Sequence, residues 1–417
     1  MTPAHSLLLA LLRRDATREK VAAFDLATFH ALLDITPRDL YPYLAWRIPQ
    51  LVDLNRVPPA VSETLDFARR GAVLRQLQRH AVLRRLALAL DTAGVPFVVL
   101  KGAALAHLAY PDPSLRSMGD IDLWTLPEHL DAAARAVLGA GMHYPERLQS
   151  RMSAADRLEE RSTRVFQSDR GNVVLELHGV VQSMATAAPG WSEAAWARSV
   201  PRDLGGVQAR VPHAEDMLTH LAVHCSAHHR FEMGLRPLLD IALWLEATAA
   251  ECDAAALAGQ WRRYGCGTWN RLTLTLVRDL LGTTGLPSLI QDSEATPASP
   301  ELREIARAQV LDSLRTLPPT LAKLAATPTA AGRARWVLQR LTIWYWRGPP
   351  GSRRGPLATV GDAVSRMAND LRTKLPSYVR GLSDGSLRGT EFRRRRALAV
   401  GRQRLAELVE QAERPAR

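Results

Sequence analysis

Residues 95–126 read VPFVVLKGAALAHLAYPDPSLRSMGDIDLWTL, and this stretch decides the fold. VPFVVLK (95–101) is a short apolar run rich in β-branched residues, which is typical of a buried strand. AALAHLAY (103–110) predicts a helix that stops at Pro111. After a loop, DIDLWTL (120–126) alternates in polarity and predicts a second strand. The order strand, turn, helix, loop and strand indicates a small α/β unit.

The residues that follow extend the same unit. Residues 127–141 predict a helix with proline in its first turn and glycine after its end. TRVFQS (163–168), the turn DRGN (169–172) and the apolar run that ends at Val181 predict a β-hairpin. The α/β unit therefore covers roughly residues 94–182.

Two aspartates on the second predicted strand indicate metal chemistry. Asp120 and Asp122 are two residues apart, so they project from the same face of a strand. Two such carboxylates repel each other unless a hard cation lies between them, and Mg²⁺ prefers these oxygens. A third carboxylate is expected on a neighbouring strand, where Glu176 fits, with His178 on the same face. Asp169 is the weaker candidate because it lies in the predicted turn.

The turn between the first strand and its helix has the residues of a phosphate site. Gly102 allows backbone N–H groups to approach a phosphate closely, and the following helix points its N-terminus at the same region. The chain has only four lysines against fifty arginines, so Lys101 beside this glycine stands out as a point charge for a phosphate oxygen. Arg116, in the loop before the aspartates, could add a forked contact.

The stretch LKGAALAHLAYPDPSLRSMGDIDLW resembles the signature of an uncharacterised bacterial nucleotidyltransferase family. Members share the pattern KGaal, Yp, R and sDiDl, followed by an E-L-H strand. They also share a helical stretch similar to AEDMLTHLAVHCSAHH and LRPLLDIALWLE in this chain. The resemblance covers about residues 95–285 and implies membership of the DNA polymerase β-like nucleotidyltransferase superfamily.

That resemblance implies an α/β core, three metal-binding carboxylates and a nucleoside triphosphate donor. By position, Asp120 and Asp122 match the metal aspartates, Gly102 the turn glycine and Glu176 the third carboxylate. The superfamily usually has Gly-Ser at the turn, whereas this chain has Lys-Gly-Ala. The phosphate contact of the serine is therefore missing, so that either Lys101 replaces it or the donor binds differently.

We expect an α+β fold, a small nucleotidyltransferase-type mixed sheet with helices, flanked by N-terminal and C-terminal helical segments. Hydrophobic periodicity and a Pro/Ser/Thr-rich stretch divide the chain into five parts. These are an N-terminal helical segment (1–93), the nucleotidyltransferase core (94–212), a helical domain packing on the core (213–282), a linker or long loop (283–301) and a basic helical C-terminal region (302–417).

The net charge of +12 is concentrated near the C-terminus. Residues 331–417 hold 19 Lys and Arg against 7 Asp and Glu, an excess of 12. Such a region can meet nucleic acid, an anionic membrane surface or an acidic peptide, and a solvated set of helices is the alternative. The sequence has no RNA-recognition signature, so a nucleic-acid partner is possible but not favoured.

The cysteines and the hydropathy pattern bear on location. The three cysteines are far apart and have no CxxC spacing, which argues against a disulfide framework and suits a reducing cytoplasm. No apolar stretch reaches membrane length without charges. We therefore expect a cytoplasmic protein without a transmembrane segment.

Histidines recur in the predicted helical domain. His220, His224 and His228 are four residues apart, so an α-helix would stack them on one face, with His229 adjacent. Two such imidazoles can bind zinc with a carboxylate such as Asp240, but the chain lacks an HExxH glutamate there. We favour a cleft-lining role, in which His224 or His228 touches nucleotide or acceptor, or only satisfies buried hydrogen bonds.

Two further spacings bear on the site. His178 could orient Glu176 or act as a base toward the acceptor hydroxyl, and a structural role is the alternative. Arg236 and Asp240 are four residues apart, which predicts an ion pair within one helix.

These observations predict a Mg²⁺-dependent nucleotidyltransferase with two ions on Asp120, Asp122 and Glu176. It would move a nucleoside monophosphate from a triphosphate such as ATP to an acceptor hydroxyl and release pyrophosphate. The alternative is a catalytically inactive module that binds nucleotide or peptide in a biosynthetic or regulatory complex. The acceptor could be a small molecule, a sugar, a peptide or a protein.

Overall fold

The computed structural model describes residues 2–145, 163–169, 171–283, 299–312 and 389–413. Contacts divide the chain into two compact units. All strands of the described residues and the helices from α1 to α17 belong to the first unit, which comprises 1–145, 159–314 and 406–417. No helix in the described ranges is long and apolar enough to cross a membrane.

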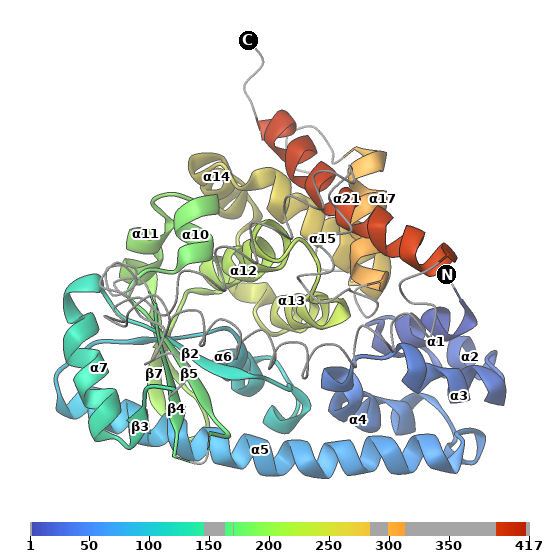
Figure 1. The fold of residues 1–417 in the computed structure, drawn as a ribbon, viewed down its shortest axis with the longest axis horizontal. Coiled ribbons are helices and arrows are strands. Elements are labelled where there is room, and N and C mark those ends of the chain that lie inside the picture. Colours follow the sequence, from blue (N-terminus) through green and yellow to red (C-terminus); the bar gives the residue numbers. More distant parts are fainter. Residues whose placement is uncertain (1, 146–162, 170, 284–298, 313–388, 414–417) are drawn as a thin grey trace, which may run out of the picture. The chain divides into compact units, whose positions relative to one another are not determined.

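Helices make up most of the described chain (Figure 1). The N-terminal helices are α1 (Pro3–Leu12), α2 (Arg18–Ala22), α3 (Leu26–Ile35), α4 (Tyr41–Leu51) and α5 (Pro59–Thr92). Among the strands lie α6 (Lys101–Leu108), α7 (Leu130–Gly139), α10 (Gln182–Ala187) and α11 (Trp191–Arg198). After them come α12 (Ala214–Val223), α13 (Leu235–Ala247), α14 (Ala254–Tyr264), α15 (Gly267–Leu281), α17 (Pro300–Asp312) and α21 (Gly389–Glu413).

One mixed sheet of seven strands has the order β3-β4-β5-β2-β1-β7-β6. Its strands are β1 (Val98–Leu100), β2 (Asp120–Trp124), β3 (Met142–His143), β4 (Thr163–Ser168), β5 (Val174–His178), β6 (Val200–Asp203) and β7 (Gln208–Val211). The pairs β2–β5 and β1–β7 are parallel, and the other neighbours are antiparallel. The predicted α+β class with a mixed sheet and flanking helices is confirmed, as is the β4–β5 hairpin.

The sheet also differs from the sequence-based expectation. The strand expected over 95–101 is limited to Val98–Leu100, and the next helix already begins at Lys101. The helix expected over 127–141 starts as a 3₁₀ turn and becomes α-helical only at Leu130. The short strands β3, β6 and β7 carry too few residues for a period-2 pattern to reveal them.

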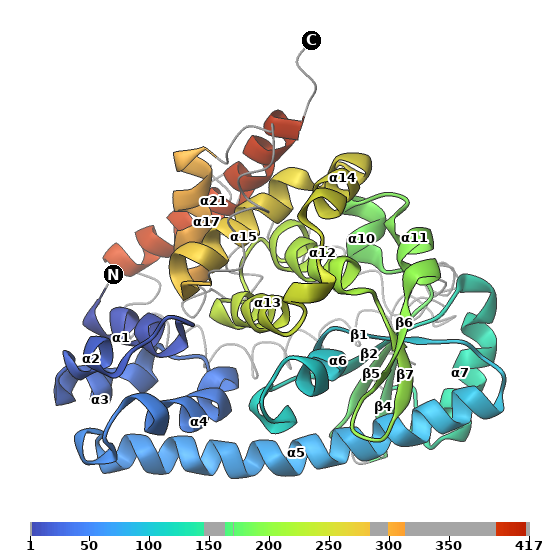
Figure 2. The same ribbon diagram turned by 180° about the vertical axis from the view of Figure 1, so that it is seen from behind.

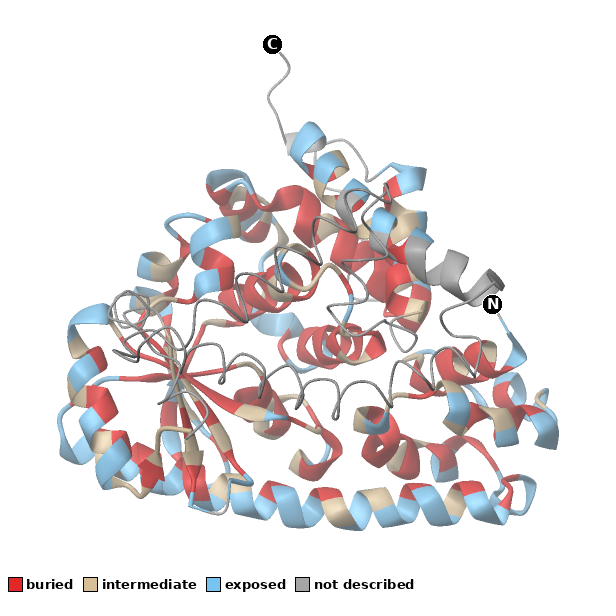
Figure 3. Ribbon diagram, in the orientation of Figure 1, coloured by how far each residue is buried: buried red, intermediate tan, exposed pale blue. Residues whose placement is uncertain are grey.

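The helix α5 connects two parts of the first unit. Its 34 residues span about 50 Å at 1.5 Å per residue. It packs on α3 and α4 toward its beginning and on α7 beside the sheet toward its end (Figures 1 and 2). Much of its length is exposed on one side, as Figure 3 shows. The helix ends ahead of Gly94, whose φ of +63° suits the left-handed bend into β1.

A layer of buried helices lies over the β1–α6 turn. All ten residues of α12 are buried, and α12 packs on α13 and α15 (Figure 3). The helix α13 also packs on α6, and α10 packs on the turn that follows α12. These contacts place the helical layer directly opposite the strand ends that carry the aspartates.

An aromatic cluster anchors β2 to the helices beyond the sheet. Trp124, at the end of β2, stacks on Trp191 with ring centroids 5.8 Å apart and meets Trp196 edge-on at 5.0 Å. Both Trp124 and Trp191 are fully buried. Because aromatic pairs of this kind add to area burial, the cluster holds the strand that carries Asp122 in a fixed position.

A buried ion pair ties the loop before β2 to α13. Arg116 donates from Nε and Nη2 to the two carboxylate oxygens of Asp240, at 3.1 and 2.8 Å. Tyr110 donates its hydroxyl to Asp240 Oδ1 at 2.7 Å. The expected ion pair between Arg236 and Asp240 is therefore wrong, since Arg236 pairs with Asp39 at 3.1 Å. The spacing of residues along one helix could not predict that Asp240 pairs with Arg116, which lies more than a hundred residues away.

The β1–α6 turn has an unusual backbone. Lys101 has φ +45°, in the left-handed region that non-glycine residues rarely adopt. The cost for an L-residue is roughly 1–2 kcal/mol. Such strain persists where the surroundings determine the conformation, and here buried β1 precedes Lys101 while α6 follows it.

Replacing Asp240 is expected to destabilise the fold strongly. Asp240→Asn leaves the Arg116 guanidinium buried without its counter-charge, so we expect a loss of about 3–5 kcal/mol. The matched control Asp279→Asn breaks an exposed ion pair with Arg278 and is expected to cost less than about 1 kcal/mol. Urea unfolding midpoints measure both, and equal midpoints would contradict the proposed weight of the buried pair.

The strain at Lys101 is testable by two substitutions at the same position. Lys101→Gly and Lys101→Ala both remove the ammonium group, but only glycine adopts the left-handed conformation without cost. We therefore expect the glycine variant to be more stable than the alanine variant by about 1 kcal/mol. Thermal unfolding of the two variants gives the difference, and an alanine variant as stable as glycine would exclude a strained turn.

Candidate functional site

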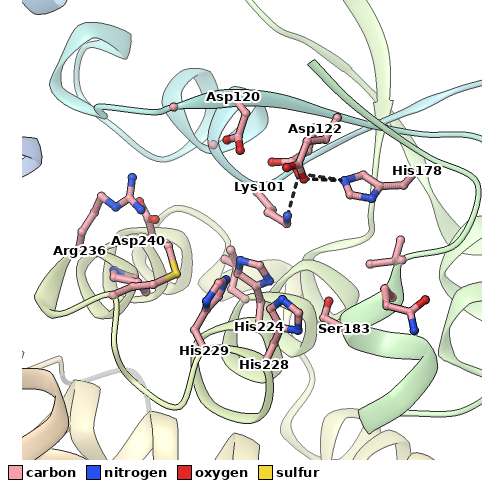
Figure 4. Close-up of a pocket in the computed structure, with 18 of the residues that line it drawn as sticks. Lys101, Asp120, Asp122, His178, Ser183, His224, His228, His229, Arg236 and Asp240 are labelled. Atoms are coloured by element: carbon pink, nitrogen blue, oxygen red, sulfur yellow. Dashed lines mark hydrogen bonds and ion pairs between the residues drawn. The ribbon is translucent and has the colours of Figure 1, made fainter. Parts of the chain in front are cut away.

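A cavity of about 470 Å³ lies between the sheet and the helical layer of the first unit. On one side it is lined by the β1–α6 turn and the adjacent β2 and β5, and on the other by α13 and the turn after α12. Figure 4 shows the two walls, with Asp120, Asp122 and His178 on the sheet side and His224, His228 and His229 on the helix side. Most of the polar residues that the sequence singles out meet here.

Strand register brings two carboxylates together. Asp122 on β2 is the register partner of Glu176 on the parallel strand β5, so their side chains leave the sheet on the same face. Asp120 precedes Asp122 by two residues and lines the same cavity. One possible ligand atom each of Asp122, Glu176 and His178 lies within 4.8 Å of the others. Spacing predicted that Asp120 shares a face with Asp122 and that Glu176 shares one with His178, and the register of β2 and β5 brings the two pairs to one cavity.

The side chains of Lys101 and His178 both contact the buried carboxylate of Asp122. The Lys101 ammonium donates to Asp122 Oδ1 at 2.7 Å, and His178 Nε2 lies 3.0 Å from the same oxygen (Figure 4). His178 Nδ1 lies 3.0 Å from the hydroxyl of Thr163, its register partner on β4. In the tautomer with the proton on Nε2, His178 donates to Asp122 and accepts from Thr163. The ring of His178 is thereby fixed at both nitrogens.

The two carboxylates differ in their affinity for a proton. Burial acts to raise the pKa of Asp122, but the hydrogen bonds and charges of His178 and Lys101 outweigh it and hold that pKa far below its usual value. Burial raises the pKa of Glu176, and the negative charge of Asp122 adds to this effect. Asp122 is therefore ionised at neutral pH, whereas Glu176 is the better proton acceptor of the two.

Gly102 and Arg116, the two residues that the sequence suggests for phosphate binding beside Lys101, pack against each other. A Cβ atom on Gly102 would lie 2.5 Å from Arg116 Nη1 and 3.0 Å from its Cζ. The turn therefore has room only for glycine while the guanidinium stays where it is. Arg116 donates two hydrogen bonds to the Asp240 carboxylate, and its Nη1 donates to the carbonyl oxygen of Ser117 at 3.1 Å. Its guanidinium lines the cavity as a fixed positive charge.

The histidines do not continue along a regular α-helix. After α12 the chain forms a π-helical turn over His224–His228, in which His229 N donates to His224 O at 3.1 Å. This brings His224, His228 and His229 to the cavity. His220 is fully buried beside Trp191, with ring centroids 5.5 Å apart. Figure 4 shows the three cavity histidines grouped below Lys101.

The remaining sequence-based candidates lie elsewhere. Asp169 is in the β4–β5 turn with 82% of its side chain exposed, and it pairs with His143 rather than with the cavity residues. Asp240 lines the cavity but is engaged by Arg116 and Tyr110. Most of the basic region over 331–417 and of the expected linker 283–301 lies outside the described residues.

Sequence reasoning missed some cavity residues. Thr163, Ser183 and His229 all line the cavity, and none was proposed as a site residue. Thr163 reaches it through its register with His178, and Ser183 through the short helix α10. The adjacent pair His228–His229 was the available signal for His229, but α-helical spacing places the second ring on another face.

The donor atoms around the cavity fall into two chemical classes. Within the described ranges, two groups of side chains could hold a metal ion: Asp122 with Glu176 and His178, and the three histidines after α12. The first group offers carboxylate oxygens, which suit a hard ion such as Mg²⁺. The second group offers only imidazole nitrogens, which suit Zn²⁺ and similar ions.

A comparison with known families agrees with this arrangement. The family model described as "uncharacterised nucleotidyltransferase" matches residues 31–282, more than half of the 417-residue chain. The matched region runs from α3 to α15 and contains both walls of the cavity. No curated protein gives a match to the chain. Because the match covers most of the chain and the whole site, this protein belongs to the uncharacterised nucleotidyltransferase family.

Proposed function

We propose that this chain is a Mg²⁺-dependent nucleotidyltransferase that moves a nucleoside monophosphate from a nucleoside triphosphate to an acceptor hydroxyl. The observation that carries this proposal is the parallel register of Asp122 and Glu176, which brings two carboxylates and His178 together at the edge of a cavity. The acceptor oxygen forms a bond to the α-phosphorus, the bond to the bridging oxygen of pyrophosphate breaks, and the hydroxyl proton goes to Glu176.

The carboxylate wall fits the ions that this reaction requires. Asp120, Asp122 and Glu176 offer oxygens on one face of β2 and β5, and they would hold Mg²⁺. Bound there, Mg²⁺ would offset the charge of the triphosphate and make an attacking hydroxyl more acidic. Asp122 stays ionised because of Lys101 and His178, so it keeps its ligand oxygens available at neutral pH.

The positive groups beside the carboxylates form the phosphate side of the proposed site. Lys101 has a flexible four-carbon stem, and we propose that its ammonium turns from Asp122 to a triphosphate oxygen. Gly102 and Arg116 line the cavity next to it. The Arg116 guanidinium stays paired with Asp240. We therefore propose that it attracts the triphosphate by its positive charge and does not leave Asp240 to bind a phosphate directly.

The acceptor would enter from the helical wall. The lining on that side includes His224, His228 and Ser183, and the proposed proton acceptor Glu176 lines the same cavity. Their hydroxyl and imidazole groups can donate and accept hydrogen bonds. We propose that they contact the acceptor, while the hydrogen bond between His178 and Asp122 holds the Asp122 carboxylate in place.

Asp122→Asn is expected to abolish transfer while the chain stays folded. Loss of a metal-binding charge is worth several kcal/mol of transition-state stabilisation, so we expect at least a ~10³-fold decrease in turnover. The assay follows transfer of label from α-labelled ATP and the other triphosphates, with Mg²⁺, into a metabolite extract and into the protein itself. The matched control Asp169→Asn removes the exposed carboxylate in the β4–β5 turn and should leave turnover unchanged.

Full activity of Asp122→Asn would refute the assignment of the site. Tight triphosphate binding by the unsubstituted chain with no transfer to any acceptor would instead support an inactive nucleotide-binding module. Circular dichroism of both variants separates loss of chemistry from loss of folding.

Lys101→Met tests the proposed triphosphate contact. Methionine keeps most of the stem and removes the charge, and a hydrogen bond to a charged group is worth about 1.5–3 kcal/mol. We expect triphosphate affinity, measured by calorimetry with Mg²⁺ present, to fall at least about tenfold. If Lys101 serves only to neutralise Asp122, the affinity would stay the same or rise, which would contradict the proposed contact.

A further inference from the structure

The helical wall carries a histidine cluster that the transfer chemistry on β2 and β5 does not require. The cluster is His224, His228 and His229, whose possible ligand atoms all lie within 4.8 Å of one another. It forms because the π-helical turn over His224–His228 inserts one residue per turn relative to an α-helix. His229 consequently lies over His224 instead of rotating to another face.

The ring geometry is close to that of a three-imidazole metal site. The ring centroids of His224 and His228 are 5.4 Å apart, and His229 lies 4.5 and 4.6 Å from them. Three imidazoles that bind one tetrahedral Zn²⁺ through nitrogens at 2.0–2.1 Å have centroids about 5 Å apart and nitrogens about 3.3 Å apart. The cluster therefore needs only small side-chain rotations to converge on one ion.

The backbone after the π-helical turn keeps the three rings together. Arg230 and Phe231 both have positive φ, +48° and +63°, which is costly for residues with a side chain. Phe231 is fully buried, and its N–H donates to Cys225 O at 2.9 Å. The buried phenylalanine thus anchors the strained reversal that directly follows His229.

At least one of the rings has a nitrogen that the described ranges of the protein do not use. His224 Nδ1 is buried and has no hydrogen-bond partner within the described part of the chain. Neutral imidazoles with available lone pairs are the form that binds metals.

We propose that His224, His228 and His229 form a binding site for one divalent transition-metal ion of the Zn²⁺ class. Imidazole nitrogens favour such ions over Mg²⁺, which prefers the carboxylate oxygens on the opposite wall. Three protein ligands leave a fourth position, as in catalytic rather than structural zinc sites. Because all three histidines line the cavity, that position would be open to water or to a polar group of the acceptor.

The test uses the full chain after treatment with a chelator. Calorimetric titration with Zn²⁺, in the presence of excess Mg²⁺, is expected to show one tight site. Titration with Co²⁺ is expected to give the visible absorption of a tetrahedral nitrogen site. His228→Gln and His229→Gln are suited to the test because neither ring is buried, so the fold is retained. Each is expected to weaken Zn²⁺ binding about 100-fold, since even loss of an outer-shell partner costs about 10–100-fold.

Three control variants locate the ion. His30→Gln removes an exposed histidine outside the cavity and should leave the affinity unchanged. Asp122→Asn and His178→Gln remove the carboxylate-side ligands and should also leave Zn²⁺ binding intact. Absence of one-to-one binding would overturn the proposal, as would binding that is lost in Asp122→Asn but kept in His228→Gln. Because the readout is metal binding, its outcome is independent of whether the chain transfers nucleotides.

Discussion

Asp122 is a nearly fully buried carboxylate, and its ionisation is the constraint on which the site depends. A buried charge persists only where partners compensate the loss of water. Lys101, which directly follows β1, and His178 on β5 provide that compensation from the two sides of β2. The same two contacts place an ammonium group and an imidazole beside Asp122, whose register partner is Glu176. The feature that keeps the carboxylate charged also assembles the groups that a triphosphate and its counter-ions would meet.

The cavity exists because the sheet and the helical layer are joined by a second buried charge pair. Arg116 belongs to the loop before β2 and Asp240 to α13, so their forked contact fixes the distance between the two walls. Arg116 also packs on Gly102, which couples the wall to the strained turn at Lys101. Removing one partner of such a pair leaves the other charge buried without compensation, so a substitution at only one of the two positions is strongly destabilising. The same Arg116 side chain therefore joins the two walls and lies beside Gly102 in the proposed phosphate site.

The two walls of the cavity offer different donor chemistry. Carboxylate oxygens gather on β2 and β5, and neutral imidazoles gather after α12. A hard cation such as Mg²⁺ would bind the carboxylate wall and a borderline cation such as Zn²⁺ the imidazole wall, without competition for ligands. The proposed transfer reaction uses the oxygen wall, and the proposed transition-metal site would bring a Lewis acid to the side from which the acceptor enters. If both proposals hold, the cavity would select an acceptor that carries a metal-binding group as well as a hydroxyl.

The sequence by itself determined the local elements of the site, because these depend on short-range patterns. Alternation over 120–126 and the apolar run before Lys101 predicted β1, α6 and β2 in order, and period-2 spacing predicted which carboxylates share a face. Only the tertiary structure decided the pairing of strands, since no local pattern specifies that β5 lies parallel to β2. It also decided the partner of Arg116, which lies on a helix far along the chain. The position of His229 depended on a π-helical turn, whose backbone departs from the α-helical period that sequence patterns assume. Contacts between distant residues and departures from regular periods arise only when the whole core packs, because there the gain from burial outweighs local preference.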